Sequence, residues 1–355
     1  MANSKDFVLV PNRINRNFIE YLDFLGFEVP IFVTSPDELP QSTEIDLLSP
    51  WGWSPAEHKK LNPFCRFTNE IWQKHQMSKW KKSHAELLSR ETTYNFITQL
   101  INSNDNSYNL LEIPSIPLKI KSLEEVKSLI DIMPPPILLK TPLSASGRGH
   151  FKIRDKNENA EQSDWIKSKL HKQKLFYAEP FLKKISDVSF HFMIEENEIN
   201  YLGNTFFSTD SKGQFIGCYV RFPENPQLNK DFLVDACHQA IELLMRGLQK
   251  LEINKVYQGP LGIDAIFFEK ENGKITLNPC VEVNLRHTMG LINLFLRKRI
   301  HPDNNGKWLI IEELINKNEF KLPQKSLKDG FISSGSFCLT VPYGDSGHVL
   351  RLNIS

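Results

Sequence analysis

The apolar and polar positions of the first hundred residues predict a small α/β unit. Apolar runs at Phe7 to Val10 and Val29 to Val33 predict two strands, and the segment from Arg16 to Leu25 predicts a helix between them. Gly26 is well placed to end that helix, and the order strand, helix, strand favours a parallel pair with a crossover helix. We therefore expect a Rossmann-like α/β domain over residues 1–105.

The rest of this stretch has weaker periodicity. From Trp72 to Leu88 the pattern predicts a polar helix, and the low-hydrophobicity stretch that follows it, through Asn102, Asn104, Asp105 and Asn106, predicts a linker or loop. The loop 49–55 reads Ser-Pro-Trp-Gly-Trp-Ser-Pro. Large aromatic side chains in loops more often serve packing than recognition. We expect Trp51 and Trp53 to fill a seam between domains, with a ligand pocket as the alternative.

A helix and a hairpin are predicted next. Ser122, with Glu125 three residues on, predicts a helix start, and three prolines from 134 predict its end. The buried strand from Ile137 to Lys140 leads into Thr-Pro-Leu-Ser-Ala-Ser-Gly-Arg-Gly, and alternation resumes at Phe151. Small residues let the backbone turn its N–H groups toward an anion, and Lys140 adds a positive charge. The hairpin therefore predicts a phosphate site, with a plain turn as the alternative.

Longer strands and one long helix follow. The apolar run from Phe176 to Leu182 is broken by Glu179, and alternating residues predict strands over 188–194 and 199–206. A connector with exposed backbone groups and a carboxylate beside apolar walls suits an adenine ring, and a solvated edge strand is the alternative. Apolar residues repeat at three and four positions from 232 to 251, which predicts an amphipathic core helix.

The most informative segment is the hairpin from Gly262 to Asn284. Its polar turn separates two apolar strands, so Asp264 and Glu282 lie on facing strands. Glu282 and Asn284 are two residues apart and point to the same face. Carboxylate and amide oxygens hold Mg²⁺ against the phosphates of a nucleotide. The hairpin therefore predicts a metal site, and the alternative is an acidic residue on the solvent face of an ordinary hairpin.

Composition describes an ordinary globular chain. Its 355 residues are 40% hydrophobic and 24% charged, and the formal net charge is +1. This balance argues against a nucleic-acid or membrane partner. Five widely spaced cysteines indicate neither a disulfide framework nor a zinc site. The apolar run at the start is too short for a signal peptide, so we expect a cytoplasmic protein with reduced cysteines.

Taken in order, these elements resemble the ATP-grasp superfamily. The match runs from about Pro114 to Leu296 and comprises a strand lysine, a small-residue loop, a Glu hinge, an Asp strand and a Glu-x-Asn strand. The resemblance implies a fold in which two α+β subdomains clasp ATP. We expect a pre-ATP-grasp domain at 1–105, a lid subdomain at 106–182 and a core subdomain with the metal site at 183–355.

The resemblance also implies roles for individual residues. The residues implied in nucleotide binding are Lys79, Lys140, Ser146, Gly147, Arg148, Gly149, Glu179, Phe181, Leu182 and Asp187. Lys79 stands for the earlier nucleotide lysine of the family, with Lys81 and Lys82 as alternatives. Glu179 and the following Phe181-Leu182 would form the adenine hinge. Asp187 is the candidate for the ribose.

The same resemblance assigns the metal and the acceptor side. Asp264, Glu282 and Asn284 fall on the metal ligands of the family, with Mg²⁺ as the metal and Mn²⁺ as an alternative. Arg286 completes a run similar to the Glu-x-Asn-x-Arg of biotin carboxylase, where the arginine faces the acceptor. D-alanyl-D-alanine ligases instead place an arginine two residues before the first metal-binding Asp, where this chain has Gly262.

The function implied is ATP-dependent ligation. A carboxylate would attack ATP to give an acyl phosphate, and an amine or thiol would then displace phosphate, with Arg286 and Lys140 as catalytic residues. The expected substrates are a small carboxylate and an amine, an amino acid or peptide among them. A small-molecule kinase, a non-catalytic nucleotide-binding protein and a carboxylase are the alternatives. The sequence indicates no oligomeric state.

Overall fold

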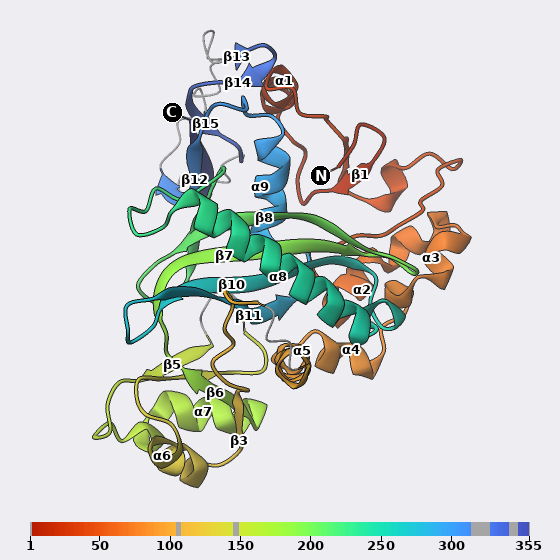
Figure 1. The fold of residues 1–355 in the computed structure, drawn as a ribbon. Coiled ribbons are helices and arrows are strands. Elements are labelled where there is room, and N and C mark those ends of the chain that lie inside the picture. The colour runs from red at the N-terminus through yellow and green to blue at the C-terminus, as the bar shows by residue number, and fades with distance from the viewer. Residues whose placement is uncertain (1, 104–107, 145–148, 314–326, 341–346, 355) are drawn as a thin grey trace.

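The protein is built around a large antiparallel sheet with a smaller sheet beside it (Figure 1). The computed structural model describes residues 2–103, 108–144, 149–313, 327–340 and 347–354. The strand order of the large sheet is β11-β10-β7-β8-β9-β12-β16-β15. Its strands are β7 (Lys183–Ile194), β8 (Ile199–Thr209), β9 (Phe215–Tyr219), β10 (Gly259–Glu269), β11 (Ile275–Asn284), β12 (Gly306–Glu313), β15 (Gly335–Cys338) and β16 (Gly347–Ile354).

The two faces of the large sheet differ in chemistry. Successive residues of a strand point to opposite faces, so Phe190 and Phe192 of β7 lie on one face and Ser189 and His191 on the other. Helix α8 (Lys230–Lys250) crosses the apolar face (Figure 1), and α9 (Met289–Arg297) packs on the polar face. The polar face is therefore the face that carries the candidate site residues.

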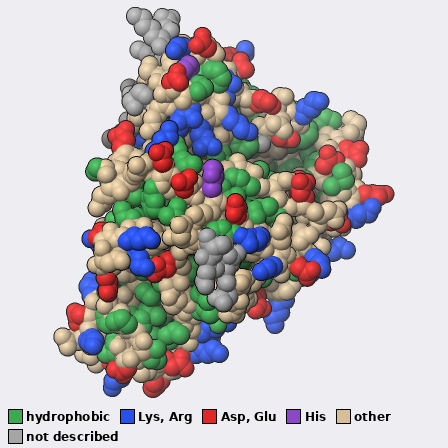
Figure 2. Space-filling view, in the orientation of Figure 1, with side chains coloured by type: hydrophobic (Ala, Val, Ile, Leu, Met, Phe, Trp, Pro, Cys, Tyr) green, Lys and Arg blue, Asp and Glu red, His purple; other side chains and the backbone are tan. Residues whose placement is uncertain are grey.

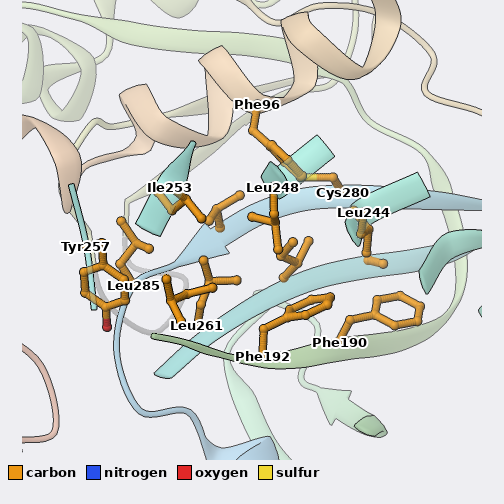
Figure 3. Packing of buried hydrophobic residues seen from close by; sticks show 14 of the residues in the cluster. Phe96, Phe190, Phe192, Leu244, Leu248, Ile253, Tyr257, Leu261, Cys280 and Leu285 are labelled. Atoms are coloured by element: carbon orange, nitrogen blue, oxygen red, sulfur yellow. The ribbon is translucent and has the colours of Figure 1, made fainter. Parts of the chain in front are cut away.

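The main core lies between the apolar face and α8. Figure 3 shows Leu244 and Leu248 of α8 packed close to Phe190 and Phe192 of β7. The predicted helix over 232–251 is confirmed with slightly earlier bounds. The labelled side chains in Figure 3 also include Leu261 of β10, Cys280 of β11 and Phe96, so α8, these three strands and Phe96 share one core.

The small sheet has its own core and helices. Its order is β3-β6-β4-β5, formed by β3 (Leu118–Ile120), β6 (Phe176–Pro180), β4 (Ile137–Lys140) and β5 (His150–Ile153). The helices are α6 (Leu123–Ile132), a short 3₁₀ turn η4 (Ala160–Gln162) and α7 (Asp164–Gln173). As predicted, the Ser122 hydroxyl caps α6 by accepting from the Glu125 N–H at 3.1 Å.

The N-terminal segment begins as the sequence predicts. Strands β1 (Phe7–Leu9) and β2 (Ile31–Val33) pair in parallel, with α1 (Arg16–Phe24) between them. In the described residues, this strand–helix–strand unit is the part of the expected Rossmann-like domain that is present. The remaining elements of this segment are η1 (Pro36–Glu38), α2 (Pro55–Leu61), η2 (Asn62–Phe67), α3 (Glu70–Lys74), η3 (Gln76–Ser78), α4 (Lys82–Leu87) and α5 (Arg90–Asn102).

Two predictions for this segment are wrong. The helix predicted from Trp72 to Leu88 is broken into α3, η3 and α4, because His75 caps the 3₁₀ turn and interrupts the helix. The polar stretch that followed is not all linker, since residues 90–102 form α5. Phe96 and Leu100 of α5 pack against Gly247 of α8, where a side chain would collide with them. Tertiary packing therefore stabilises a helix whose exposed face is polar.

The remaining short elements lie between strands of the large sheet. They are η5 (Ile253–Lys255) and the strands β13 (Leu327–Lys328) and β14 (Phe331–Ile332), which pair with each other as a separate two-stranded sheet. All five cysteines are free, as predicted. In the part of the chain that the structure describes, no helix combines the length and the apolar character needed to cross a membrane. Acidic and basic side chains are interspersed over the face seen in Figure 2.

Candidate functional site

The predicted carboxylate cradle forms where β10 and β11 pair. Asp264 lies directly opposite Glu282, and Gly262 lies opposite Asn284. The Asn284 side-chain amide donates to Asp264 Oδ2 at 3.0 Å. A β-bulge follows Asp264, so the register shifts before regular pairing resumes at Ile266 and Asn278. The structure therefore brings the three predicted metal ligands together on one face.

The two carboxylates have different electrostatic surroundings. Burial, followed by the charge of Glu282, raises the pKa of Asp264 to about 6. Burial also acts to raise the pKa of Glu282, but the positive charges of Arg90 and Lys140 outweigh it, and this pKa lies below its usual value. Glu282 is therefore held as an anion, whereas the charge on Asp264 is poorly compensated.

Arg90 is a site residue that the sequence did not predict. Its Nη2 lies 2.9 Å from Glu282 Oε1, its Nε donates to the Thr141 carbonyl at 3.2 Å, and its side chain is only 5% exposed. Its Nη1 is buried without a hydrogen-bond partner. Arg90 begins α5, so missing that helix meant missing the residue. A signal was present, because Ser89 is a favoured helix cap and its hydroxyl accepts from the Glu91 N–H at 3.2 Å.

The predicted nucleotide lysines precede this helix. Lys79 follows η3, Lys81 precedes α4 and Lys82 begins it. In the described part of the chain, Arg90 is the basic residue of this segment that contacts Glu282. A nucleotide contact for Lys79 stays a prediction.

Lys140 joins the small sheet to the large one. Its ammonium group forms an ion pair with Glu179 on β6 and donates to the Val281 carbonyl of β11 at 3.4 Å. His150 lies opposite Lys140 in the β4–β5 register, with Nε2 buried and unpartnered. Burial and the charges of Lys140 and Arg90 lower the pKa of His150 to about 4, so the imidazole is neutral at pH 7. A strand lysine, the Glu179 carboxylate and a neutral imidazole thus lie at the junction of the sheets.

The predicted phosphate loop is described only at its edges. Ser146, Gly147 and Arg148 lie outside the described residues. Gly149 accepts the Thr141 N–H at 2.9 Å, and a Cβ at this position would collide with Thr141 and Ser144. Glycine is therefore required where the loop returns to β5.

The predicted hinge residues connect the two sheets. Phe181 and Leu182 lie between the end of β6 and the start of β7, and the Phe181 N–H donates to the Pro136 carbonyl at 2.9 Å. The Lys152 ammonium lies 3.5 Å from the centre of the exposed Phe181 ring. Such a connector is where an adenine ring is expected in the resembling family, and this role stays a prediction.

Asp187 already has protein partners. Its Oδ2 accepts from Lys184 Nζ at 2.6 Å and from Thr209 Oγ1 at 3.1 Å, and burial raises its pKa despite the nearby ammonium. It lies on β7 two residues from Ser189, which faces Asp264. A ribose contact by Asp187 stays a prediction.

Arg286 lies beside a small cavity at the end of β11. Its Nη2 donates to Asn284 Oδ1 at 3.0 Å and its Nη1 to the His287 carbonyl at 3.2 Å. The cavity has a volume of about 130 Å³. Charged, polar and apolar groups from four segments of the chain line it: Gly52, Trp53, Leu88, Ser89, Arg90, Pro142, Leu143, Ser144 and residues 282–286. Arg286 thus faces a space next to the predicted metal ligands.

The neighbours of Arg286 have structural contacts. His287 Nε2 lies 2.9 Å from the Ser49 hydroxyl, and its ring stacks near Trp51. Thr288 caps α9 and its hydroxyl lies 3.2 Å from His191 Nδ1. Burial lowers the pKa of His191 to about 3, which keeps this histidine neutral. These contacts fix the backbone that carries Arg286.

The donor set of the cradle fits a hard divalent cation. Groups of three or more His, Cys, Asp or Glu side chains suited to a metal are absent from the described residues. The cradle instead offers two carboxylates, Asp264 and Glu282, and the Asn284 amide. Mg²⁺ is usually bound by one or two carboxylates together with phosphate oxygens. A cation between facing carboxylates would also relieve the charge that raises the Asp264 pKa.

The two sheets meet at Lys140 and the carboxylate cradle, which is the arrangement that the resemblance to the ATP-grasp superfamily implies. No family model matches the chain and no curated protein matches its sequence. Among solved structures, N5-carboxyaminoimidazole synthase from Aspergillus clavatus, in complex with ADP and 5-aminoimidazole ribonucleotide, has a TM-score of 0.54 at 12% identity. The match covers 99% of this chain and 94% of that one. The chain therefore has the ATP-grasp fold, as the resemblance implied.

Biotin carboxylases are also similar. The biotin carboxylase from Campylobacter jejuni has a TM-score of 0.49 at 11% identity over 76% of this chain. The biotin carboxylase domain of 2-oxoglutarate carboxylase from Hydrogenobacter thermophilus has a TM-score of 0.46 at 14% identity, again over 76%. The chain spans 64% and 62% of the length of these two proteins.

Proposed function

We propose that the protein is an ATP-dependent ligase, which activates a carboxylate as an acyl phosphate for attack by an amine. The observation that carries the proposal is the apposition of Asp264 and Glu282 on paired strands, with Arg286 and Arg90 lining a cavity beside them. Metal-type donors next to guanidinium groups suit a reaction that passes through phosphorylated anions. The ATP-grasp fold supports the same class.

Nucleotide binding in this proposal uses both sheets. Lys140 leaves Glu179 to contact phosphate, and Glu179, with the Phe181-Leu182 connector, receives the adenine ring. Arg90 and the neutral His150 supply donors, since each has a buried nitrogen without a partner. A ligand that accepts these hydrogen bonds would satisfy both groups. Residues 106–182 would act as the lid, 183–355 as the core and 1–105 as the pre-ATP-grasp domain.

Asp264, Glu282 and Asn284 would hold Mg²⁺. When bound, the ion would supply positive charge that neutralises the phosphates. Arg90 keeps Glu282 ionised in its absence, so the ligand is ready in the charged form. The Asn284 amide orients Asp264.

In the proposed reaction, each bond that forms is matched by a bond that breaks. A substrate carboxylate oxygen attacks the γ-phosphorus of ATP, and the bond to the ADP oxygen breaks. The amine nitrogen then attacks the acyl carbon, phosphate departs and the nitrogen loses a proton. Arg286 orients the carboxylate and stabilises the negative charge of the acyl phosphate. The protein acts by positioning and charge, and the proposal requires no covalent bond to a side chain.

Hydroxylamine tests this proposal, because it converts acyl phosphates to hydroxamates. With Mg²⁺, ATP and a panel of small carboxylic acids, we expect hydroxamate and phosphate in equal amounts from the wild type. We expect neither from Arg286→Met, although that variant still binds MgATP. Phosphate transfer to a stable product that hydroxylamine does not consume would instead identify a kinase. No ATP turnover with any acid or hydroxyl compound would favour a non-catalytic protein.

A further inference from the structure

Helix α5 lies beside the junction of the two sheets (Figure 1). One side of its first turn contacts the large sheet. Arg90 Nη2 lies 2.9 Å from Glu282 Oε1, and the Thr93 hydroxyl accepts from the Val283 N–H at 2.9 Å. Residues three apart lie on the same side of a helix. This side of the turn therefore holds α5 against β11, the strand that carries Glu282.

The neighbouring side of the same turn contacts the small sheet. Glu91 Oε1 accepts from Lys119 Nζ of β3 at 2.6 Å, and Glu91 Oε2 accepts from the Tyr177 hydroxyl of β6. The Lys119 ammonium lies 4.1 Å from the centre of the Tyr94 ring, and Tyr94 lies three residues after Glu91. Burial acts to raise the pKa of Glu91, but the bonds from Lys119 and Tyr177 outweigh it and lower this pKa. An ionised Glu91 thus binds two strands of the small sheet.

The two partners of Glu91 belong to a row of residues that crosses the whole small sheet. Lys119 lies opposite Tyr177 in the pairing of β3 with β6, and Tyr177 lies opposite Lys140 in the pairing of β6 with β4. His150 of β5 lies opposite Lys140 and ends the row. Residues directly opposite each other on paired strands share one face of the sheet. The contacts of Glu91 at one end of the row therefore bear on the place of Lys140 near the other.

We propose that Glu91 is a positioning residue, which fixes the small sheet so that Lys140 lies beside the carboxylate cradle before a nucleotide binds. The inference rests on the proposed nucleotide site and adds a residue that acts through Tyr177 and Lys119. Without the Glu91 carboxylate, α5 keeps its contacts to β11 but loses its bonds to β3 and β6. The small sheet then samples orientations in which Lys140 lies away from the cradle.

Loss of this anchor should weaken nucleotide binding in a defined way. Only the anchored orientation presents Lys140 and the cradle to the same phosphates. When a fraction of the molecules is competent to bind, the apparent dissociation constant equals the intrinsic one divided by that fraction. Saturating ligand selects the competent orientation again. The variants should therefore bind MgATP more weakly and react at the normal rate once it is bound.

The first measurement is the Kd of MgATP by isothermal titration calorimetry, without any acid. We expect this Kd to rise about 10-fold in Glu91→Ala, within the range of about 5- to 150-fold that is typical of coupled sites. Tyr177→Phe keeps the buried ring and loses only the hydroxyl, so it should fold normally and raise the Kd by a smaller factor. In the double variant the Kd should equal that of Glu91→Ala, because the Tyr177 hydroxyl acts through Glu91.

Turnover separates positioning from a direct role in the reaction. With an acid that the wild type converts to hydroxamate, KM for MgATP should rise about 10-fold in Glu91→Ala. The kcat at saturating MgATP should stay within about twofold of the wild type. A lower kcat at an unchanged Kd would show that Glu91 acts in the chemical step, and it would overturn the positioning role.

Glu158→Ala is the matched control. The Glu158 side chain is 25% exposed, against 19% for Glu91, and its partner Arg154 follows β5 in the same small-sheet unit. This variant loses an ion pair that does not reach α5, and its Kd for MgATP should match the wild type. An equal Kd in wild type, Glu91→Ala and Tyr177→Phe, or an equal rise in Glu158→Ala, overturns the inference and leaves the ligase proposal standing.

Two further outcomes separate the inference from the proposed function. Weaker MgATP binding in Glu91→Ala and Tyr177→Phe, without hydroxamate from any acid in the wild type, supports the positioning role and refutes the ligase. If the wild type does not bind MgATP at all, both are overturned.

Discussion

Replacing Asp264 by Asn should stabilise the metal-free protein at neutral pH. A pKa of about 6 instead of 3.8 means that the folded protein holds the proton more tightly than the unfolded chain. Ionisation of Asp264 therefore opposes folding. Each pKa unit corresponds to about 1.4 kcal/mol, so the upper limit of the penalty is about 3 kcal/mol. Asp264 keeps partial contact with solvent, and we expect Asp264→Asn to gain about 1–3 kcal/mol at pH 7.5.

The stability of the wild type should depend on pH because the pKa of Asp264 is raised in the folded protein. Below pH 3.8 the Asp264 carboxyl is protonated in both the folded and the unfolded chain, and it does not lower the free energy of unfolding. That free energy falls as the pH rises from 3.8 through about 6. Urea unfolding in EDTA should therefore give nearly equal free energies for wild type and Asp264→Asn at pH 4, and a more stable variant at pH 7.5.

A matched control and a refuting result complete the test. Asp131→Asn, at an exposed position of α6, should leave the difference between the two pH values unchanged. Stabilisation by MgATP should be lost in Asp264→Asn, so that the variant gains stability and loses the ligand. If Asp264→Asn were destabilised equally at both pH values, the charge of Asp264 would not be the source of strain in the cradle.

Three further predictions concern the site and the core. MgATP at 100 times its dissociation constant should stabilise the wild type by about 2.7 kcal/mol, and EDTA or Glu282→Ala should abolish this gain in a thermal-shift titration. Arg90→Met should cost about 2–3 kcal/mol in urea, below the range for fully buried pairs because the Glu282 side chain is 31% exposed. Adding Glu282→Gln should restore most of that loss, and strictly additive effects would contradict the coupling. Phe267→Ala, at a fully buried position, should cost about 3–5 kcal/mol, against less than about 1 kcal/mol for the exposed Phe295→Ala.

The carboxylate cradle was predictable because it depends on local periodicity. A two-residue period and one polar turn were enough to place Asp264 and Glu282 on facing strands, and the β10–β11 register sets the two residues directly opposite each other. The amphipathic helix over 232–251 was predictable for the same reason, since its apolar residues repeat over many turns. Where one pattern extends over ten or more residues, burial of one face decides the element and its orientation.

Arg90 was not predictable in this way. Its ion pair with Glu282 spans 192 residues of sequence, and no periodic pattern reports on such a contact. The helix that carries it has a polar first half, and its apolar residues are satisfied only by α8. The Trp51 to Trp53 loop shows the same limit, because the sequence alone presents a packing role and a ligand pocket as alternatives. Trp53 stacks on Trp72 and also lines the cavity.

Charge pairing within the site indicates where a cation would bind. Glu179 contacts Lys140, and Glu282 contacts Arg90, so two of the three carboxylates at the sheet junction are neutralised by the protein. Asp264 instead accepts a hydrogen bond from the neutral Asn284 amide and has a raised pKa. A divalent ion placed against Asp264 and Glu282 would restore the ordinary ionisation of Asp264, and nucleotide phosphates would take Lys140 from Glu179. Ligand binding and stability therefore depend on the same few charges. Substitutions that remove an uncompensated charge from the free protein should stabilise it and weaken the binding of the metal and the nucleotide.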